Sequence, residues 1–258
     1  MSFYSFSSKI KLSYSQCVSD EEFTLKIIPK SFCNQRVYDL SYSVKPSDYL
    51  SSFEDTFKNI ALAGRVKDLH TEINIQLAGK VESCDSPLKQ LPNEPLFLYD
   101  RQTRLTSIGN NLNSLYSTLN KKFISARERA IYLAGVINEN MRYKKGVTNN
   151  LTTAEEAYSL KEGVCQDYSH ILIALLRRDG INARYVAGLL EGVGESHGWV
   201  EVLDNDYWYT IDPVNLESNK YHLKIAIGQD SSDTLINRGI YRGGGSCSME
   251  ACYTLKRI

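Results

Sequence analysis

A cysteine, a histidine and an aspartate in the second half of the chain are of the types that carry out nucleophilic catalysis. Cys165 opens a stretch whose apolar residues recur every three or four positions, which predicts a buried helix. The first turn of a helix has unpaired N–H groups and the positive end of the helix dipole, and both favour a thiolate. The same N–H groups can stabilise an oxyanion beside the sulfur. From this segment alone, a structural cysteine at the start of a core helix is an equally good interpretation.

Two neighbouring segments that contain His197 and Asp212 alternate between apolar and polar residues, with Asp204, Asn205 and Asp206 between them. This pattern predicts a β-hairpin. A loop made of Asp204 and Asn205 places His197 directly opposite Asp212. A loop made of Asn205 and Asp206 places the same histidine diagonal to Asp212, on the same face of the hairpin. A three-residue loop would put the two side chains on opposite faces. In either two-residue register the imidazole can take the thiol proton and later protonate a leaving amine, while the carboxylate orients the ring.

The patterns around these residues predict the elements that position them. Short alternating runs over the first eighty or so residues predict antiparallel strands with one solvated face. Three of the six prolines fall within residues 84–97, which predicts a linker. Helical periodicity follows, with capping-box patterns that begin at Ser125 and Thr152. We therefore expect a β-rich domain over residues 1–83, a linker over 84–97 and an α+β core over 98–258.

Composition and charge exclude several classes of protein. The 258 residues are 42% hydrophobic and 23% charged, with 30 basic and 30 acidic side chains, which is typical of a globular protein. No long block of one charge occurs, so we expect no nucleic-acid or membrane partner. The longest aliphatic run, residues 171–176, is too short to span a bilayer, and the first residues lack the features of a secretion signal. We therefore expect a cytoplasmic protein.

Cysteine spacing indicates neither a metal site nor a disulfide framework. No Cys-x-x-Cys pair and no cysteine–histidine cluster at zinc-ligand spacing occurs, so we expect no metal and no cofactor. The six cysteines are also too widely spread to staple a small secreted domain. Apart from Cys165, we expect each of them to be a small buried or half-buried hydrophobe, namely Cys17, Cys33, Cys84, Cys247 and Cys252.

Four further side chains are candidates for contacts near the expected site. Trp199 shares strand parity with His197, so it could shield the imidazole or line a cleft, and a purely structural tryptophan is an equal alternative. Tyr143 precedes the helix that follows Thr152 and could border a substrate groove. Gln166 could donate to an oxyanion. We expect His170, on the cysteine helix, to be a packing or hydrogen-bonding residue.

Four sequence motifs resemble those of the bacterial and archaeal branch of the transglutaminase-like cysteine peptidase superfamily. They are Gly-Val-Cys-Gln-Asp-Tyr-Ser-His at 163–170, Ala-Arg-Tyr-Val-Ala-Gly at 183–188, Ser-His-Gly-Trp-Val-Glu at 196–201 and Asp-Pro-Val-Asn at 212–215. Residues 53–59 and 69–82 resemble the β-rich N-terminal domain that precedes the core in many members, and residues 226–230 and 241–245 also fit the branch. Two departures are visible. Gly198 stands where many relatives have alanine, and Lys58 stands where the N-terminal motif usually has glycine.

The resemblance implies both a fold and an activity. The fold is a papain-like α+β core, with the cysteine helix packed on an antiparallel sheet. Cys165 is implied as the nucleophile, His197 as the general base and Asp212 as the orienting acid. The expected activity is thiol-dependent cleavage of a peptide or isopeptide bond in a peptide or protein substrate, through a thioester acyl-enzyme. Acyl transfer to an amine and a catalytically silent binding module are the alternatives, and the residues leave the substrate's identity and the oligomeric state open.

Overall fold

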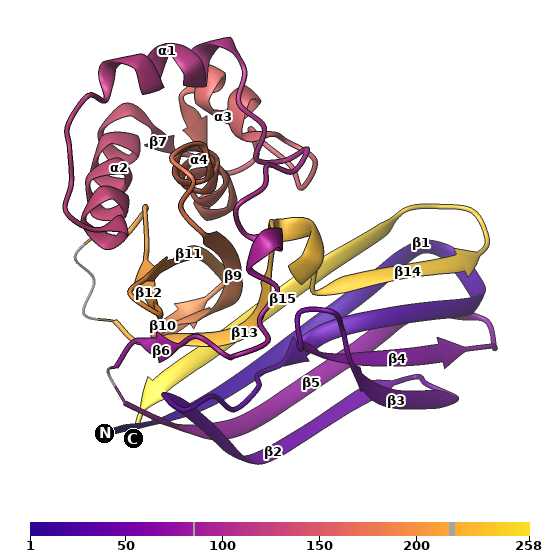
Figure 1. The fold of residues 1–258 in the computed structure, drawn as a ribbon. Helices are drawn as coiled ribbons and strands as arrows, with labels where there is room; N and C mark the ends of the chain where they lie inside the picture. The colour runs from indigo at the N-terminus through magenta and orange to yellow at the C-terminus, as the bar shows by residue number, and fades with distance from the viewer. Residues whose placement is uncertain (85, 217–219) are drawn as a thin grey trace.

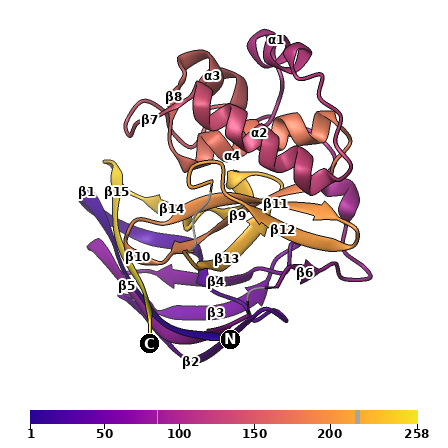
Figure 2. The ribbon, with the colours of Figure 1, turned by 90° about the vertical axis from the view of Figure 1, so that its left-hand side faces the viewer.

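The protein is described by a computed structural model over residues 1–84, 86–216 and 220–258, and its elements form three layers (Figures 1 and 2). Helices cover one face of a five-stranded sheet, and a larger sheet packs against the other face. Leu189 and Leu223 of the smaller sheet join the apolar core of the larger one, whereas Val200 and Val202 join the core beneath the helices. None of the described helices is long and apolar enough to cross a membrane.

The larger sheet is organised around β1 (Ser2–Ile28), a long strand that pairs with different neighbours along its two halves. Its first half lies between β5 and β15, and its second half lies between β4 and β14, all antiparallel. Alternate residues of β1 are buried, as the apolar–polar pattern predicts. The other strands of this sheet are β2 (Gln35–Lys45), β3 (Tyr49–Glu54), β4 (Ile60–Val66), β5 (His70–Ser83), β10 (Gly192–Gly194), β14 (Asn237–Arg242) and β15 (Cys247–Arg257).

The C-terminal strands complete the larger sheet, which differs from the expected assignment of residues 98–258 to the core. β15 pairs with β1 from Tyr14↔Cys247 to Tyr4↔Arg257. The expected linker is also attached to the core. Within it, β6 (Leu88–Lys89) pairs with β12, and Glu94 forms an ion pair with the buried Arg184. Residue 85 of that linker lies outside the described residues.

The five-stranded sheet has the order β13-β9-β11-β12-β6, and every pairing in it is antiparallel. Its longer strands are β9 (Ala183–Leu190), β11 (His197–Asp204), β12 (Tyr207–Ile211) and β13 (His222–Gly228). α4 (Cys165–Arg178) packs on β9 and β11. The remaining elements are α1 (Asn110–Thr118), α2 (Ala126–Asn140), α3 (Ala154–Leu160), the strands β7 (Arg142–Tyr143) and β8 (Glu162–Gly163), and the 3-10 turns η1 (Leu96–Leu98) and η2 (Ser231–Thr234).

α3 begins one residue later than the sequence predicts, and its capping residues explain the difference. α2 begins after Ser125, as expected. The cap of α3 is Thr153 rather than Thr152, because Thr153 and Glu156 exchange side-chain and backbone hydrogen bonds in a capping box. Glu155 is therefore free to accept hydrogen bonds from backbone N–H groups at the start of α1, a helix that the sequence analysis did not expect.

Lys58 adopts a positive φ of 64°, the left-handed conformation that glycine adopts most easily. This conformation accounts for the glycine that the family motif usually has at this position.

The expectation that five cysteines are buried or half-buried is wrong for four of them. Cys17, Cys33, Cys247 and Cys252 are exposed, and Cys84 is half-buried. In β15, Cys252 points to the face opposite the buried Tyr253 and Leu255, so strand parity places it in solvent.

Candidate active site

Cys165 is the first residue of α4, so its thiol lies at the positive end of the helix dipole, as the apolar pattern predicts. The buried carboxylate of Asp167 accepts hydrogen bonds from the Val164 N–H and the Thr148 hydroxyl, both at 2.7 Å. These contacts fix the loop that leads into the helix. Burial raises the pKa of Asp167 despite both hydrogen bonds.

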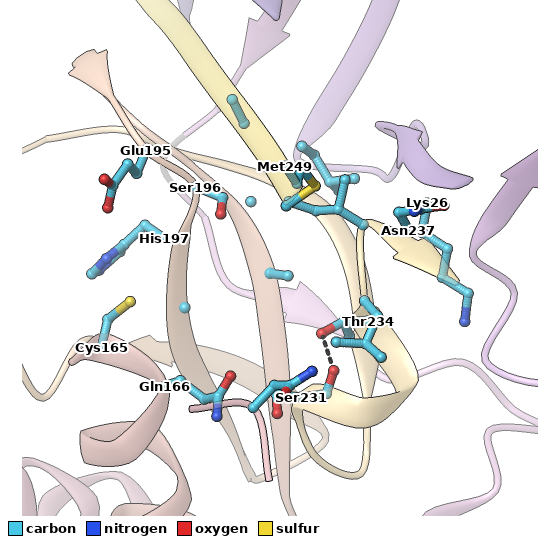
Figure 3. Close-up of a pocket in the computed structure, with 18 of the residues that line it drawn as sticks. Lys26, Cys165, Gln166, Glu195, Ser196, His197, Ser231, Thr234, Asn237 and Met249 are labelled. Carbon is cyan, nitrogen blue, oxygen red and sulfur yellow. Dashed lines mark hydrogen bonds between the residues drawn. The ribbon is translucent and has the colours of Figure 1, made fainter. Parts of the chain in front are cut away.

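The hairpin of β11 and β12 has the second of the two expected registers. Asp204 pairs with Tyr207, and the loop residues Asn205 and Asp206 both have positive φ values, of 46° and 64°. His197 and Asp212 therefore lie diagonally on one face, with 2.7 Å between His197 Nε2 and Asp212 Oδ2. Figure 3 shows the Cys165 sulfur directed toward the imidazole ring from the start of α4. The structure thus brings the three side chains together in one row.

Neighbouring groups in this row shift the pKa values of both His197 and Asp212. Burial would lower the pKa of His197, but hydrogen bonds to Asp212 and Cys165 outweigh burial and raise it to about 9. Burial would raise the pKa of Asp212, but hydrogen bonds from His197 and His222 hold it well below its usual range. At neutral pH the arrangement therefore favours an imidazolium beside an ionised carboxylate.

Every hydrogen-bond partner of the Asp212 carboxylate is a donor. Oδ1 accepts from the backbone N–H groups of Val214 and Asn215, at 2.9 and 3.0 Å. Oδ2 accepts from the Asn215 side-chain amide at 3.0 Å and faces the Nε2 atoms of His197 and His222. The Asp-Pro-Val-Asn motif therefore folds back on its own first residue and fixes the carboxylate in place.

His222, at the start of β13, is a member of this cluster that the sequence analysis missed. Its Nε2 lies 3.1 Å from Asp212 Oδ2, and its Nδ1 lies 3.0 Å from the Lys220 carbonyl oxygen. Both of these partner atoms can accept hydrogen bonds. No spacing in the sequence relates His222 to Asp212, because Asp212 follows β12 while His222 begins β13, and these two strands are not adjacent in the sheet. A histidine at the first position of a core strand was the only available signal.

Within the part of the chain that the structure describes, this cluster offers three side chains that could bind a metal ion. His197, Asp212 and His222 offer ligand atoms that lie within 4.8 Å of one another. A divalent cation there would compete for the atoms that form the His197–Asp212 hydrogen bond.

Trp199 lies behind the imidazole. Its side chain is 1% exposed and packs with Val186 and Ile227. Its ring lies 6.1 Å from the ring of His197 at an interplanar angle of 25°, and 5.0 Å from that of His222. Trp199 therefore shields the histidines from the back. It does not line the cleft at Cys165 but borders a second cavity together with Asp212 and His222.

Tyr143 and Gln166 both line a cleft of about 930 Å³ together with Cys165 and His197. The Tyr143 hydroxyl lies against the backbone N–H of Cys165, and burial followed by the nearby Cys165 raises its pKa to about 12. The Gln166 amide donates to the Asn149 carbonyl at 3.3 Å, which holds its side chain at the cleft wall.

His170 is a buried hydrogen-bonding residue and does not approach the cleft. Its Nε2 accepts from the Ser231 N–H at 3.1 Å. Burial lowers its pKa to about 4, so the ring is neutral at physiological pH.

The departure at Gly198 is explained by Tyr185. A Cβ atom at position 198 would lie 2.1 Å from the Tyr185 hydroxyl oxygen and 2.8 Å from Cζ. Tyr185 is buried, and its ring packs 5.5 Å from that of His170, so it has little room to move. The tyrosine thus occupies the space that an alanine at position 198 would need.

We expect Gly198→Ala to lower the free energy of unfolding by about 1–3 kcal/mol, because it overpacks this contact. Urea denaturation measures the change. The control is Gly135→Ala in α2, where an added Cβ has no heavy atom within 4 Å and should stabilise the helix by about 0.5–1 kcal/mol. Adding Tyr185→Leu to Gly198→Ala should recover much of the loss. An unchanged urea midpoint in Gly198→Ala would contradict the explanation.

Comparison with known proteins gives matches over most of the chain. Residues 116–213, which contain Cys165, His197 and Asp212, match the transglutaminase-like superfamily. Residues 4–82 match the bacterial transglutaminase-like N-terminal region. An uncharacterized protein of Mycobacterium leprae is 22% identical over 255 residues, which cover 90% of this chain and 91% of that protein. An uncharacterized protein of Mycobacterium bovis is 32% identical over 126 residues, which cover 42% of this chain and 40% of that protein.

Among solved structures, a protein described as a "putative cysteine protease" from Cytophaga hutchinsonii has a similar fold. The TM-score is 0.83 at 19% sequence identity, and the match covers 100% of this chain and 91% of that one. At this level of identity the likeness shows a shared fold. It extends over both sheets and the helices.

Proposed function

This chain combines a transglutaminase-like core with a bacterial transglutaminase-like N-terminal region, and we propose that it is a cysteine peptidase or amidase. One observation carries the proposal. A cysteine at the start of a helix faces a histidine whose Nε2 lies 2.7 Å from a buried carboxylate. Nucleophile, base and orienting acid follow one another in that row, as nucleophilic catalysis requires. The packing of α4 on the antiparallel sheet of β9 and β11 supports a papain-like α+β core.

The proposed reaction has two steps. Cys165 Sγ, having given its proton to His197, attacks the carbonyl carbon of the scissile amide, and a backbone N–H in the first turn of α4 stabilises the oxyanion. The imidazolium protonates the leaving nitrogen, the C–N bond breaks, and an amine departs from a thioester acyl-enzyme. Water then attacks the thioester as His197 takes its proton. The C–S bond breaks, the acid is released, and the proton returns to the sulfur.

We expect the wild-type protein to convert an amide-bearing peptide to the free acid, because water reaches the acyl-enzyme through the open cleft. Mass spectrometry of the products, with and without an added primary amine, measures this. Free acid as the main product under both conditions supports hydrolysis. An amine adduct that replaces the acid would identify the protein as an acyl transferase instead. No product in either condition, with peptides and small amides alike, would contradict the proposed function.

A further inference from the structure

Among the described residues, one edge of β15 is unpaired over part of its length near the candidate site. The Ile258 N–H donates to the Phe3 carbonyl, and the Ser15 N–H donates to the Ser246 carbonyl, at 2.9 and 3.1 Å. These bonds show that even-numbered residues of β15 hydrogen bond to β1. Backbone groups in an antiparallel strand point alternately to its two edges, so the odd-numbered residues point away from β1.

β10 covers only part of that outer edge. It pairs with β15 at Tyr253, Thr254 and Leu255. Beyond this point the chain leaves the line of β10 and enters β11 at His197. Among the residues that the structure describes, no strand pairs with the outer edge of β15 from Cys247 to Cys252. The outward N–H and C=O groups in this stretch belong to Cys247, Met249 and Ala251.

The unpaired edge lines the cleft that contains Cys165 and His197. Figure 3 shows Met249 across the cavity from these two residues, with Ser196 between the two walls. The Met249 side chain is 46% exposed, so the wall offers apolar surface as well as free backbone groups.

This edge carries few of the features that normally prevent strand addition, and the charge of Glu250 is the one within residues 247–251. Proteins protect exposed edges with lysine, proline or bulges. Residues 247–251 read Cys-Ser-Met-Glu-Ala, with neither lysine nor proline, and they pair with β1 without a register shift. A regular edge without lysine, proline or a bulge, inside a cleft, is suited to bind another strand.

We propose that the substrate is an extended peptide segment that adds to this edge as a further strand, in line with β10, and presents its scissile carbonyl to Cys165. The inference rests on the proposed function and specifies its substrate class. Main-chain hydrogen bonds to Met249 and Ala251 supply affinity in this mode of recognition, and alternate side chains supply specificity. Side chains on the same face as Met249 and Ala251 are expected to be apolar. Five strand residues span about 16 Å, so a small amide is too short to use the edge.

A scan of N-methylated peptide substrates tests the inference on the wild-type protein. Methylation removes one backbone donor at a time. We expect kcat/KM to fall at least tenfold at every second position on one side of the scissile bond, and to change little at the positions between. Equal effects at all positions, or none, would overturn the inference while leaving hydrolysis itself intact. If the protein cleaves neither peptides nor aryl amides, the proposed function fails instead.

Ala251→Pro tests the same edge from the protein's side. It removes an outward N–H without removing a bond to β1, and proline is tolerated on free edges. We expect kcat/KM to fall about tenfold or more for a long peptide, and to fall less for a single-residue aryl amide. The control is Ser52→Pro in β3. Hydrogen bonding of Asp55 to Asn59 places the Ser52 N–H on another free edge, away from the cleft. Equal losses for both substrates would overturn the inference.

Discussion

We expect the Cys165→Ala protein to fold like the wild type and to lose turnover by about a million-fold, as nucleophile removal does in other hydrolases. The thiol is half-buried at the first residue of α4, and the helix is held by the apolar residues that follow it. Removing the sulfur therefore removes the acyl acceptor without opening a cavity in the core. Thermal unfolding and kcat, measured on the same preparation, separate the two effects. Residual turnover above about one thousandth of the wild type would show that another group performs the attack.

Alkylation provides an independent control for this prediction. The exposed Cys17, Cys33 and Cys252 provide reference thiols on the same protein. We expect iodoacetamide to label Cys165 faster than these residues near neutral pH, and His197→Ala to slow that labelling. If Cys165 reacts no faster than the half-buried Cys84, and His197→Ala has no effect, the protein is a binding module that kept the fold.

Local patterns were enough to place Cys165 at the start of a helix and to bring His197 and Asp212 near each other. The apolar stripe after Cys165 defines the start of α4, because helical periodicity is a property of neighbouring residues. The hairpin register was open between two choices, since Asp-Asn and Asn-Asp both tolerate the left-handed conformation that a tight turn requires. The structure selects the loop of Asn205 and Asp206.

Features that depend on long-range pairing were not visible in the sequence. β15 alternates like any strand, and nothing local indicates that it pairs with β1 at the opposite end of the chain. The position of His222 depends on the same kind of contact, because β13 meets β9 rather than β12. α1 forms from a polar sequence that gains Glu155 as an acceptor from another helix. In each case the stabilising partner is too far away in the sequence for a local periodic pattern to reveal it.

Replacing Asp212 with asparagine should lower kcat by about 10²–10⁴-fold and change KM far less. A neutral amide serves as the orienting group in some cysteine proteases, but the contacts of Asp212 do not allow one here. Both carboxylate oxygens accept hydrogen bonds from donors. An asparagine must therefore turn its NH₂ group either toward two backbone N–H groups or toward His197 and His222. One set of donors loses its acceptor in either orientation.

The same substitution should shift the pH dependence of the reaction. Asp212 helps raise the pKa of His197 to about 9, so the imidazolium persists from neutral pH to about that value in the wild type. Without the carboxylate the folded-state pKa falls. The proton is then lost at lower pH, and the alkaline limb of kcat/KM moves toward neutrality. The control is Asp206→Asn, an exposed loop residue with a left-handed backbone that asparagine also adopts. If Asp212→Asn keeps the wild-type kcat and the alkaline limb of its kcat/KM profile does not move, Asp212 is not part of the catalytic row. The raised pKa of His197 would then need another cause.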